Sequence, residues 1–209
     1  IFTTKSNLTS FEPSFTTSDI YSSAYNIRSV FSADLDGDGD MDIISGSEDD
    51  DKIAWHENDG NADPSFASTT IATSANGVYS IYVTDIDSDG DMDIVSASIN
   101  DDTIAWYEND GNATPSFTAR DITTSAIGAT NVSAADMDND GDMDIISVSH
   151  HDNKISWYEN DGAANPDFIK HDINEAVNGF LYSIFAADMD GDGDMDMVTA
   201  SANNDRIDW

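Results

Sequence analysis

The chain has 209 residues, of which 42 are acidic and 7 are basic, and its formal net charge is -35. A negative field of this size repels phosphates and anionic lipid headgroups, so we expect neither a nucleic-acid partner nor an anionic membrane surface. The sequence contains no cysteine, and no apolar run approaches the length of a membrane span. We therefore expect no disulfide and no membrane insertion.

One unit of 51 or 52 residues recurs four times, and this repetition dominates the organisation of the chain. Each copy contains a proline, then an aspartate-rich loop, then a tryptophan. The repeats predict a single domain with units over about 13–63, 64–114, 115–165 and 166–209, the last completed by residues 13–22. The repeated residues are Pro13, Pro64, Pro115 and Pro166, and Trp55, Trp106, Trp157 and Trp209.

Each unit is predicted to form four short β-strands and no helix. In the first unit a strand over 29–33 enters the acidic loop, a strand over 42–47 leaves it, and a third strand carries Trp55. An Asn-Asp-Gly turn then leads to a more polar fourth strand over 66–71. In the later units the strands that enter the loop span 78–84, 131–135 and 182–187, and the fourth strands span 117–122 and 168–173.

A repeated four-stranded antiparallel sheet of this size is typical of a blade, so the predicted fold is an all-β β-propeller. Residues 14–20 have the phase of a fourth strand, whereas the final segment, 206–209, has the phase of a third strand. We therefore predict that these two segments pair and close a ring of four blades around an axis lined by the first strands. The alternative is that the four repeats belong to a larger propeller.

Every aspartate-rich loop has the pattern D-x-D-x-D-G-D-M-D, with carboxylates at positions 1, 3, 5, 7 and 9 and glycine at position 6. These carboxylates would repel one another unless a cation lay among them. Oxygen donors without His or Cys favour Ca²⁺, so we predict four calcium sites. The candidate ligands are Asp34, Asp36, Asp38, Asp40, Asp42, Asp85, Asp87, Asp89, Asp91, Asp93, Asp136, Asp138, Asp140, Asp142, Asp144, Asp188, Asp190, Asp192, Asp194 and Asp196.

The loop resembles that of an EF-hand but has a different ending and different flanks. An EF-hand closes with a glutamate at position 12 and lies between helices. Position 12 here is Ser45, Ser96, Ser147 or Thr199, and strand-forming residues follow the loop. The aspartate at position 9 is therefore the expected closing ligand. Position 7 is expected to offer its backbone carbonyl, which leaves its side chain free for the rim of the site or for contacts with the ligands themselves.

These motifs resemble the FG-GAP/VCBS repeats, the calcium-loop propeller repeats of integrin heads and secreted bacterial surface proteins. The resemblance rests on AADMDGDGDMD at 186–196 and IAWYENDG at 104–111, and it covers residues 13–209. It implies side-chain ligands from loop positions 1, 3, 5 and 9 and a carbonyl ligand from position 7. Propellers of this family usually have seven blades, whereas this chain has four repeats.

The expected function is that of a calcium-stabilised extracellular or cell-surface module for binding or adhesion, with a protein or glycan as its ligand. Weak calcium loops work where calcium is plentiful, which is outside the cell. The alternatives are a lectin-like propeller and an accessory domain of a polysaccharide-degrading enzyme. We expect no catalytic activity, because a catalytic site is singular whereas the candidate acids Glu57, Glu108 and Glu159 recur from unit to unit.

Three further residue sets receive structural interpretations. The repeated tryptophans are expected to form core between blades rather than platforms for sugars. The methionines at loop position 8 are expected to plug the core beneath each loop. The pair His150-His151 has no third ligand at zinc-site spacing, so no zinc site is predicted there. The methionines are Met41, Met92, Met143 and Met195.

Overall fold

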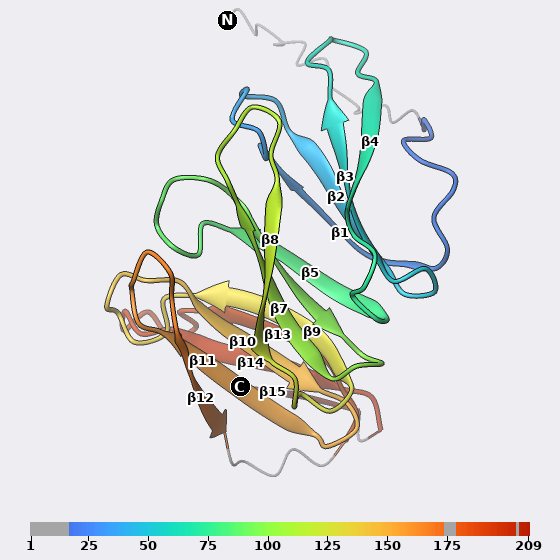
Figure 1. Cartoon of the computed structure of the whole chain (residues 1–209). Helices are drawn as coiled ribbons and strands as arrows, with labels where there is room; N and C mark the ends of the chain where they lie inside the picture. The colour runs from blue at the N-terminus through green and yellow to red at the C-terminus, as the bar shows by residue number, and fades with distance from the viewer. Residues whose placement is uncertain (1–16, 174–178, 204) are drawn as a thin grey trace, which may run out of the picture.

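The computed structural model describes residues 17–173, 179–203 and 205–209. Within these residues the regular structure is entirely β-strand, arranged as four antiparallel sheets in chain order (Figure 1). They include no helix that is long and apolar enough to cross a membrane. This is the all-β, propeller-like arrangement predicted from the repeats.

Each sheet is formed by one continuous stretch of chain. The first contains β1 (Ile27–Ala33), β2 (Asp42–Ser47), β3 (Lys52–Asn58) and β4 (Phe66–Ala72). The second contains β5 (Val78–Thr84), β6 (Asp93–Ser98), β7 (Thr103–Asn109) and β8 (Phe117–Thr123). The third contains β9 (Ala129–Ala135), β10 (Asp144–Ser149), β11 (Lys154–Asn160) and β12 (Phe168–Ile173). The fourth contains β13 (Leu181–Ala187), β14 (Asp196–Ser201) and β15 (Arg206–Asp208).

The strands of each sheet follow one another as a meander, so sequence neighbours are also hydrogen-bonded neighbours. Short acidic turns permit this arrangement, because Asp51 and Asp102 adopt positive φ between the second and third strands. Every residue of β6 and of β10 is buried, as expected for strands covered on both faces. The central residues of the fourth strands β4 and β8 are exposed, as the polar sequence of these strands predicts.

The blades pack through repeated apolar contacts between one sheet and the first strand of the next. Ile44, Ile53 and Trp55 of the first sheet form a cluster with Val78 and Ile81 of β5. Equivalent clusters join the second sheet to the third and the third to the fourth. Successive first strands lie side by side, which agrees with the predicted axis.

Side-chain acceptors also join the first strands. The backbone N–H of Ile81 donates to Ser29 Oγ at 3.1 Å. Two blades further along the chain, the N–H of Ile184 donates to Asn131 Oδ1 at 2.9 Å. In both contacts a side-chain oxygen of one blade accepts a backbone N–H from the first strand of the other, in addition to the apolar packing.

The predicted strand bounds agree with the structure to within two residues, and the 168–173 strand matches β12. The predicted pairing of 14–20 with 206–209 stays a prediction, because residues 14–16 lie outside those described. Residues 17–20 carry no strand, and β15 pairs with β14. The unit boundaries likewise stay a prediction.

The one-residue insertion in the last unit shapes the contact between the third and fourth sheets. Phe180 takes the backbone place that Gly128 has one blade earlier, since their carbonyls accept equivalent N–H groups from Ala202 and His150. The Phe180 ring stacks on the His150 ring with 4.2 Å between centroids and 4° between planes. His150 thus packs against an aromatic ring of the next blade.

Candidate metal centres

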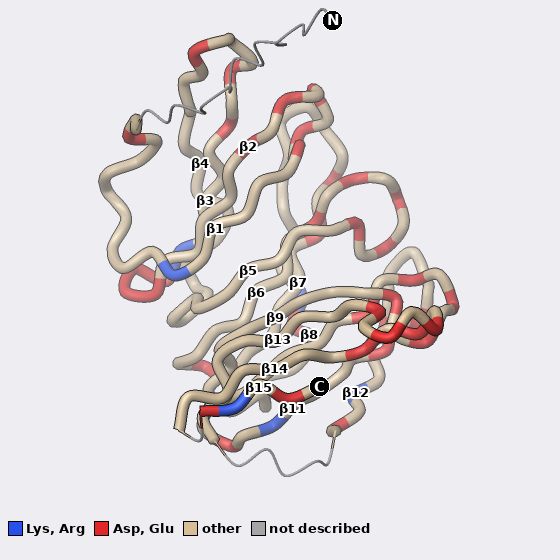
Figure 2. The backbone as a smooth tube through the Cα atoms, turned by 180° about the vertical axis from the view of Figure 1, so that it is seen from behind, with Lys and Arg blue, Asp and Glu red and all other residues tan. Residues whose placement is uncertain are grey.

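The four acidic loops join the first strand of each sheet to the second, and acidic residues gather in these and other loops at the strand ends (Figure 2). In every loop three aspartates bring one carboxylate oxygen each to within 4.8 Å of the others. Four oxygen-only groups could therefore hold metal ions. The groups are Asp34, Asp36 and Asp38; Asp85, Asp87 and Asp93; Asp136, Asp138 and Asp144; and Asp188, Asp190 and Asp196.

Backbone N–H groups within the loop orient several of the carboxylates. In the second loop the N–H of Gly90 donates to Asp85 Oδ2 at 3.0 Å, and the N–H of Asp91 donates to Asp89 Oδ1 at 3.0 Å. Gly90 has a φ of 100°, which glycine adopts without strain. The same two hydrogen bonds recur in the other loops, so the four loops share one backbone fold.

The aspartate at position 9 connects the loop to the rest of its blade. Asp144 is 0 % exposed, its Oδ2 accepts the N–H of Met137 at 2.9 Å, and its Oδ1 accepts the N–H of Asn160 at 2.8 Å. Asp42 and Asp93 make the same pairs of hydrogen bonds. These carboxylates hold the start of the loop against the end of the third strand, a role that the sequence did not reveal.

Burial makes the charged form of these carboxylates costly. It raises the pKa of Asp93 to about 7, with a smaller contribution from the Asp87 carboxylate. Burial also raises the pKa of Asp144 and that of Asp87, and the neighbouring Asp89 raises the latter further. A cation among these groups would offset the repulsion and favour their ionised state. The donor set therefore fits a hard divalent ion such as Ca²⁺.

The side chain at position 7 packs against the Asn-Asp-Gly turn that follows the third strand. A Cβ on Gly111 would lie 2.0 Å from Asp91 Oδ2, and Gly111 has a φ of 65°. Gly60 and Gly162 meet Asp40 and Asp142 in the same way. The glycine of this turn is thus required by its close approach to the loop as well as by its backbone conformation.

The loops are connected to neighbouring blades. Asn109 Nδ2 donates to the carbonyl of Leu35, in the first loop, at 2.9 Å. Asn160 Nδ2 donates to the carbonyl of Ile86, in the second loop, at 2.9 Å. The end of each of these third strands therefore supports the acidic loop of the preceding blade.

The methionine prediction was wrong for three of the four loops. Met41 is 53 % exposed, and Met92 and Met195 are also exposed, whereas Met143 is partly buried. The physical reason is alternation: the aspartate at position 9 turns inward to accept backbone N–H groups, so position 8 turns outward. The core beneath the first two loops is filled instead by position 2, as Leu35 and Ile86.

The tryptophans form core between blades wherever a following blade covers them. Trp55 is 3 % exposed and Trp106 is 1 % exposed, and Trp157 packs against the cluster between the third and fourth sheets. Trp209, on the last sheet, is 70 % exposed. The structural interpretation therefore holds for the first three copies.

Repeated antiparallel blades with oxygen-rich loops at equivalent positions define a propeller-like repeat protein with candidate metal centres. The FG-GAP-like repeat family matches residues 34–96, 85–147 and 136–199. These matches together span most of the chain, which therefore belongs to the FG-GAP-like repeat family. No individual curated protein matches the chain.

Proposed function

We propose that the chain is a calcium-stabilised module for binding or adhesion outside the cell. The observation that carries the calcium assignment is the recurrence of three converging aspartate oxygens in all four loops. FG-GAP repeats are commonly extracellular binding modules, which supports the location and the class of function.

The aspartates at positions 1, 3, 5 and 9 would hold the ion, and position 7 would add its backbone carbonyl. The ion would neutralise carboxylates that the fold forces together, and it would connect the start of the loop to its end. Any ligand that binds only the folded chain stabilises it, by about 2.7 kcal/mol at a hundred times its dissociation constant. Calcium would thus be a condition for stable folding as well as a bound ion.

A lectin-like module is the second candidate function. The support for it is that some aspartates of the loops, such as Asp38 and Asp138, are exposed, since calcium bound there could also coordinate sugar hydroxyls. The repeated tryptophans do not support it, because Trp55 and Trp106 are buried between blades. Binding of a protein ligand therefore remains the main proposal.

Binding to a glycan array and to immobilised extracellular-matrix proteins, each with and without chelator, would separate these functions. Calcium-dependent capture of a protein with no glycan signal is the expected result. Saturable, calcium-dependent glycan binding would instead establish the lectin function. Absence of calcium binding in calorimetry would contradict both.

A further inference from the structure

In the second and third sheets a planar, nitrogen-bearing side chain lies over the repeated tryptophan. The Arg120 guanidinium lies over the Trp106 ring, with 5.4 Å from its Cζ to the ring centroid. In the third sheet the His171 ring stacks on the Trp157 ring, with 4.5 Å between centroids and 26° between planes. Each of these partners is the residue of the fourth strand that lies directly opposite the tryptophan.

The same two side chains also pair with the glutamate two residues beyond the tryptophan. Arg120 donates from Nε and Nη2 to Glu108 Oε2, at 2.9 and 2.6 Å. His171 Nε2 lies 2.7 Å from Glu159 Oε2. Residues two apart in a strand share a face, so the tryptophan and the glutamate present one surface to the partner. A π face beside a carboxylate favours a planar cation.

The first sheet has the tryptophan and the glutamate but not their partner. Thr69 lies opposite Trp55, so a short neutral side chain stands where the other two sheets have a planar one. Glu57 is the corresponding glutamate, and in the described part of the chain it has no ion-pair partner, unlike its two counterparts. The first sheet therefore keeps both recognition elements and lacks the group that they hold elsewhere.

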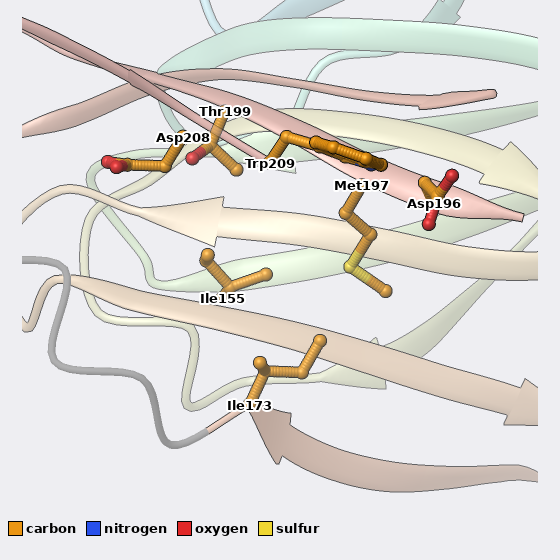
Figure 3. Close-up of a pocket in the computed structure, with 7 residues that line it drawn as sticks. All are labelled: Ile155, Ile173, Asp196, Met197, Thr199, Asp208 and Trp209. Atoms are coloured by element: carbon orange, nitrogen blue, oxygen red, sulfur yellow. The ribbon is translucent and has the colours of Figure 1, made fainter. Parts of the chain in front are cut away.

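A cavity of about 240 Å³ lies at this place, between the outer strands of the first and second sheets. Trp55 and residues 69–71 line it from the first sheet, and residues 115–117 line it from the second. Trp55 is 3 % exposed, so only a flat, narrow group can reach its ring. A larger cavity of about 470 Å³ lies between the third and fourth sheets, but its wall includes Trp209, the last residue of the sequence (Figure 3). The smaller cavity is bounded only by complete four-stranded sheets.

Negative charge borders the smaller cavity on both sides. Glu57 lies on the same face of β3 as Trp55, because the two residues are two apart. On the opposite wall the Ser116 hydroxyl donates to Asp110 Oδ2 at 2.5 Å, so a second carboxylate lies beside the cavity. The formal net charge of the whole chain is -35. A cationic group is therefore attracted by the local carboxylates as well as by the long-range field.

We propose that this cavity binds the side chain of an arginine presented by a partner protein. The guanidinium lies over the Trp55 ring and pairs with Glu57, in the arrangement that Arg120 has in the second sheet. Arginine fits better than lysine, because its planar group can stack on a ring and donate two hydrogen bonds to one carboxylate. The inference rests on the proposed binding function and names the chemistry of one contact with its protein ligand. The site is built by third and fourth strands rather than by the acidic loops.

The first test is titration of the calcium-loaded 209-residue chain with acetyl-Gly-Arg-Gly amide, followed by ¹H–¹⁵N NMR. We expect saturable shifts at residues 55, 69–71 and 115–117. Binding should be roughly fivefold tighter than that of the peptide with citrulline in place of arginine, since citrulline keeps the shape but has no charge. Glu57→Gln should reduce the arginine peptide to the level of the citrulline peptide and leave the citrulline peptide unchanged.

The second test exchanges the residues opposite the tryptophans. Thr69→Arg supplies the missing guanidinium within the chain and should abolish binding of the arginine peptide. Arg120→Thr removes the internal guanidinium of the second sheet and should add a second set of shifts, at Trp106. Thr124→Arg adds the same charge at an exposed residue just after β8 and is the matched control, with binding unchanged.

Four results would overturn the proposal: no saturable shift, equal binding of the arginine and citrulline peptides, undiminished binding in Thr69→Arg or Glu57→Gln, or no new shifts at Trp106 in Arg120→Thr. Calcium binding and capture of matrix proteins are measured on the same samples. If both persist while the arginine peptide fails to bind, the arginine site is wrong and the proposed function stands. If calcium binding itself is absent, the proposed function fails first.

Discussion

The second and fourth sheets carry the same motif but bury it to very different degrees. Ile104 and Trp106 are 0 % and 1 % exposed, whereas their counterparts Ile207 and Trp209 are 80 % and 70 % exposed. The first sheet shows the same effect on its other face, where Val30 is 65 % exposed and its counterpart Ile81 is 4 % exposed. Burial is therefore a property of the contact between blades, and the motif supplies only one half of each contact.

The largest expected effect concerns the loops, which all four sheets share. Removing calcium with a chelator should lower the melting temperature steeply, because four sites at a hundred times their dissociation constants would together contribute about 10 kcal/mol. Circular dichroism melts with and without calcium measure this, with added NaCl as the control for ionic strength. An unchanged melt would show that the loops stabilise the fold without metal.

Truncation of the repeated tryptophan should cost much more stability in an inner blade than in the last one. Trp106→Ala removes a fully buried ring and should reduce the free energy of unfolding by about 3–5 kcal/mol. Trp209→Ala, at an exposed position, should change it by less than about 0.5 kcal/mol. Urea unfolding in saturating calcium measures both. Equal losses would mean that another surface covers Trp209 in solution.

A smaller effect is expected at the phenol groups. Tyr158→Phe leaves the buried Ser147 hydroxyl without the Tyr158 oxygen and should reduce the free energy of unfolding by about 1 kcal/mol. Tyr182→Phe, on the fourth sheet, is the control, because Tyr182 is 41 % exposed. If the two variants lose the same stability, the hydrogen bond between Ser147 and Tyr158 contributes nothing.

The smallest effect concerns Asp172, on β12. Lys170 and the Ser156 hydroxyl hold the pKa of this carboxylate below its ordinary value, so its contribution is present above that ordinary value and is lost as pH falls through the lowered one. Asp172→Asn should reduce the free energy of unfolding at neutral pH by less than about 1 kcal/mol, because solvent screens this partly exposed pair.

The pH dependence of this variant provides the check. The difference from the unmodified chain should disappear in acid, below the lowered pKa of Asp172. Asp121→Asn, at the corresponding exposed position of β8, controls for the change of side chain. A difference that persists in strong acid would exclude ionisation of Asp172 as its cause.

Much of the fold follows from local sequence. Turn chemistry and strand periodicity predicted the strands. The twenty aspartates expected as calcium ligands stay a prediction, and the structure brings together positions 1, 3 and 5 in the first loop and positions 1, 3 and 9 in the others. The orientation of Met41 was missed, because it depends on the hydrogen bonds that Asp42 makes with distant backbone groups.

The hydrogen bond from Asn109 to the carbonyl of Leu35 makes the contact between successive blades asymmetric, because the later blade supports the loop of the earlier one. Because the second blade supports the first loop and the third supports the second, the first two units depend on their successors for the order of their loops. In a nearest-neighbour array of this kind, opening of a terminal unit costs less than opening of a central one. Destabilising one blade should therefore also increase the rate of amide hydrogen exchange in the acidic loop of the blade before it in the sequence.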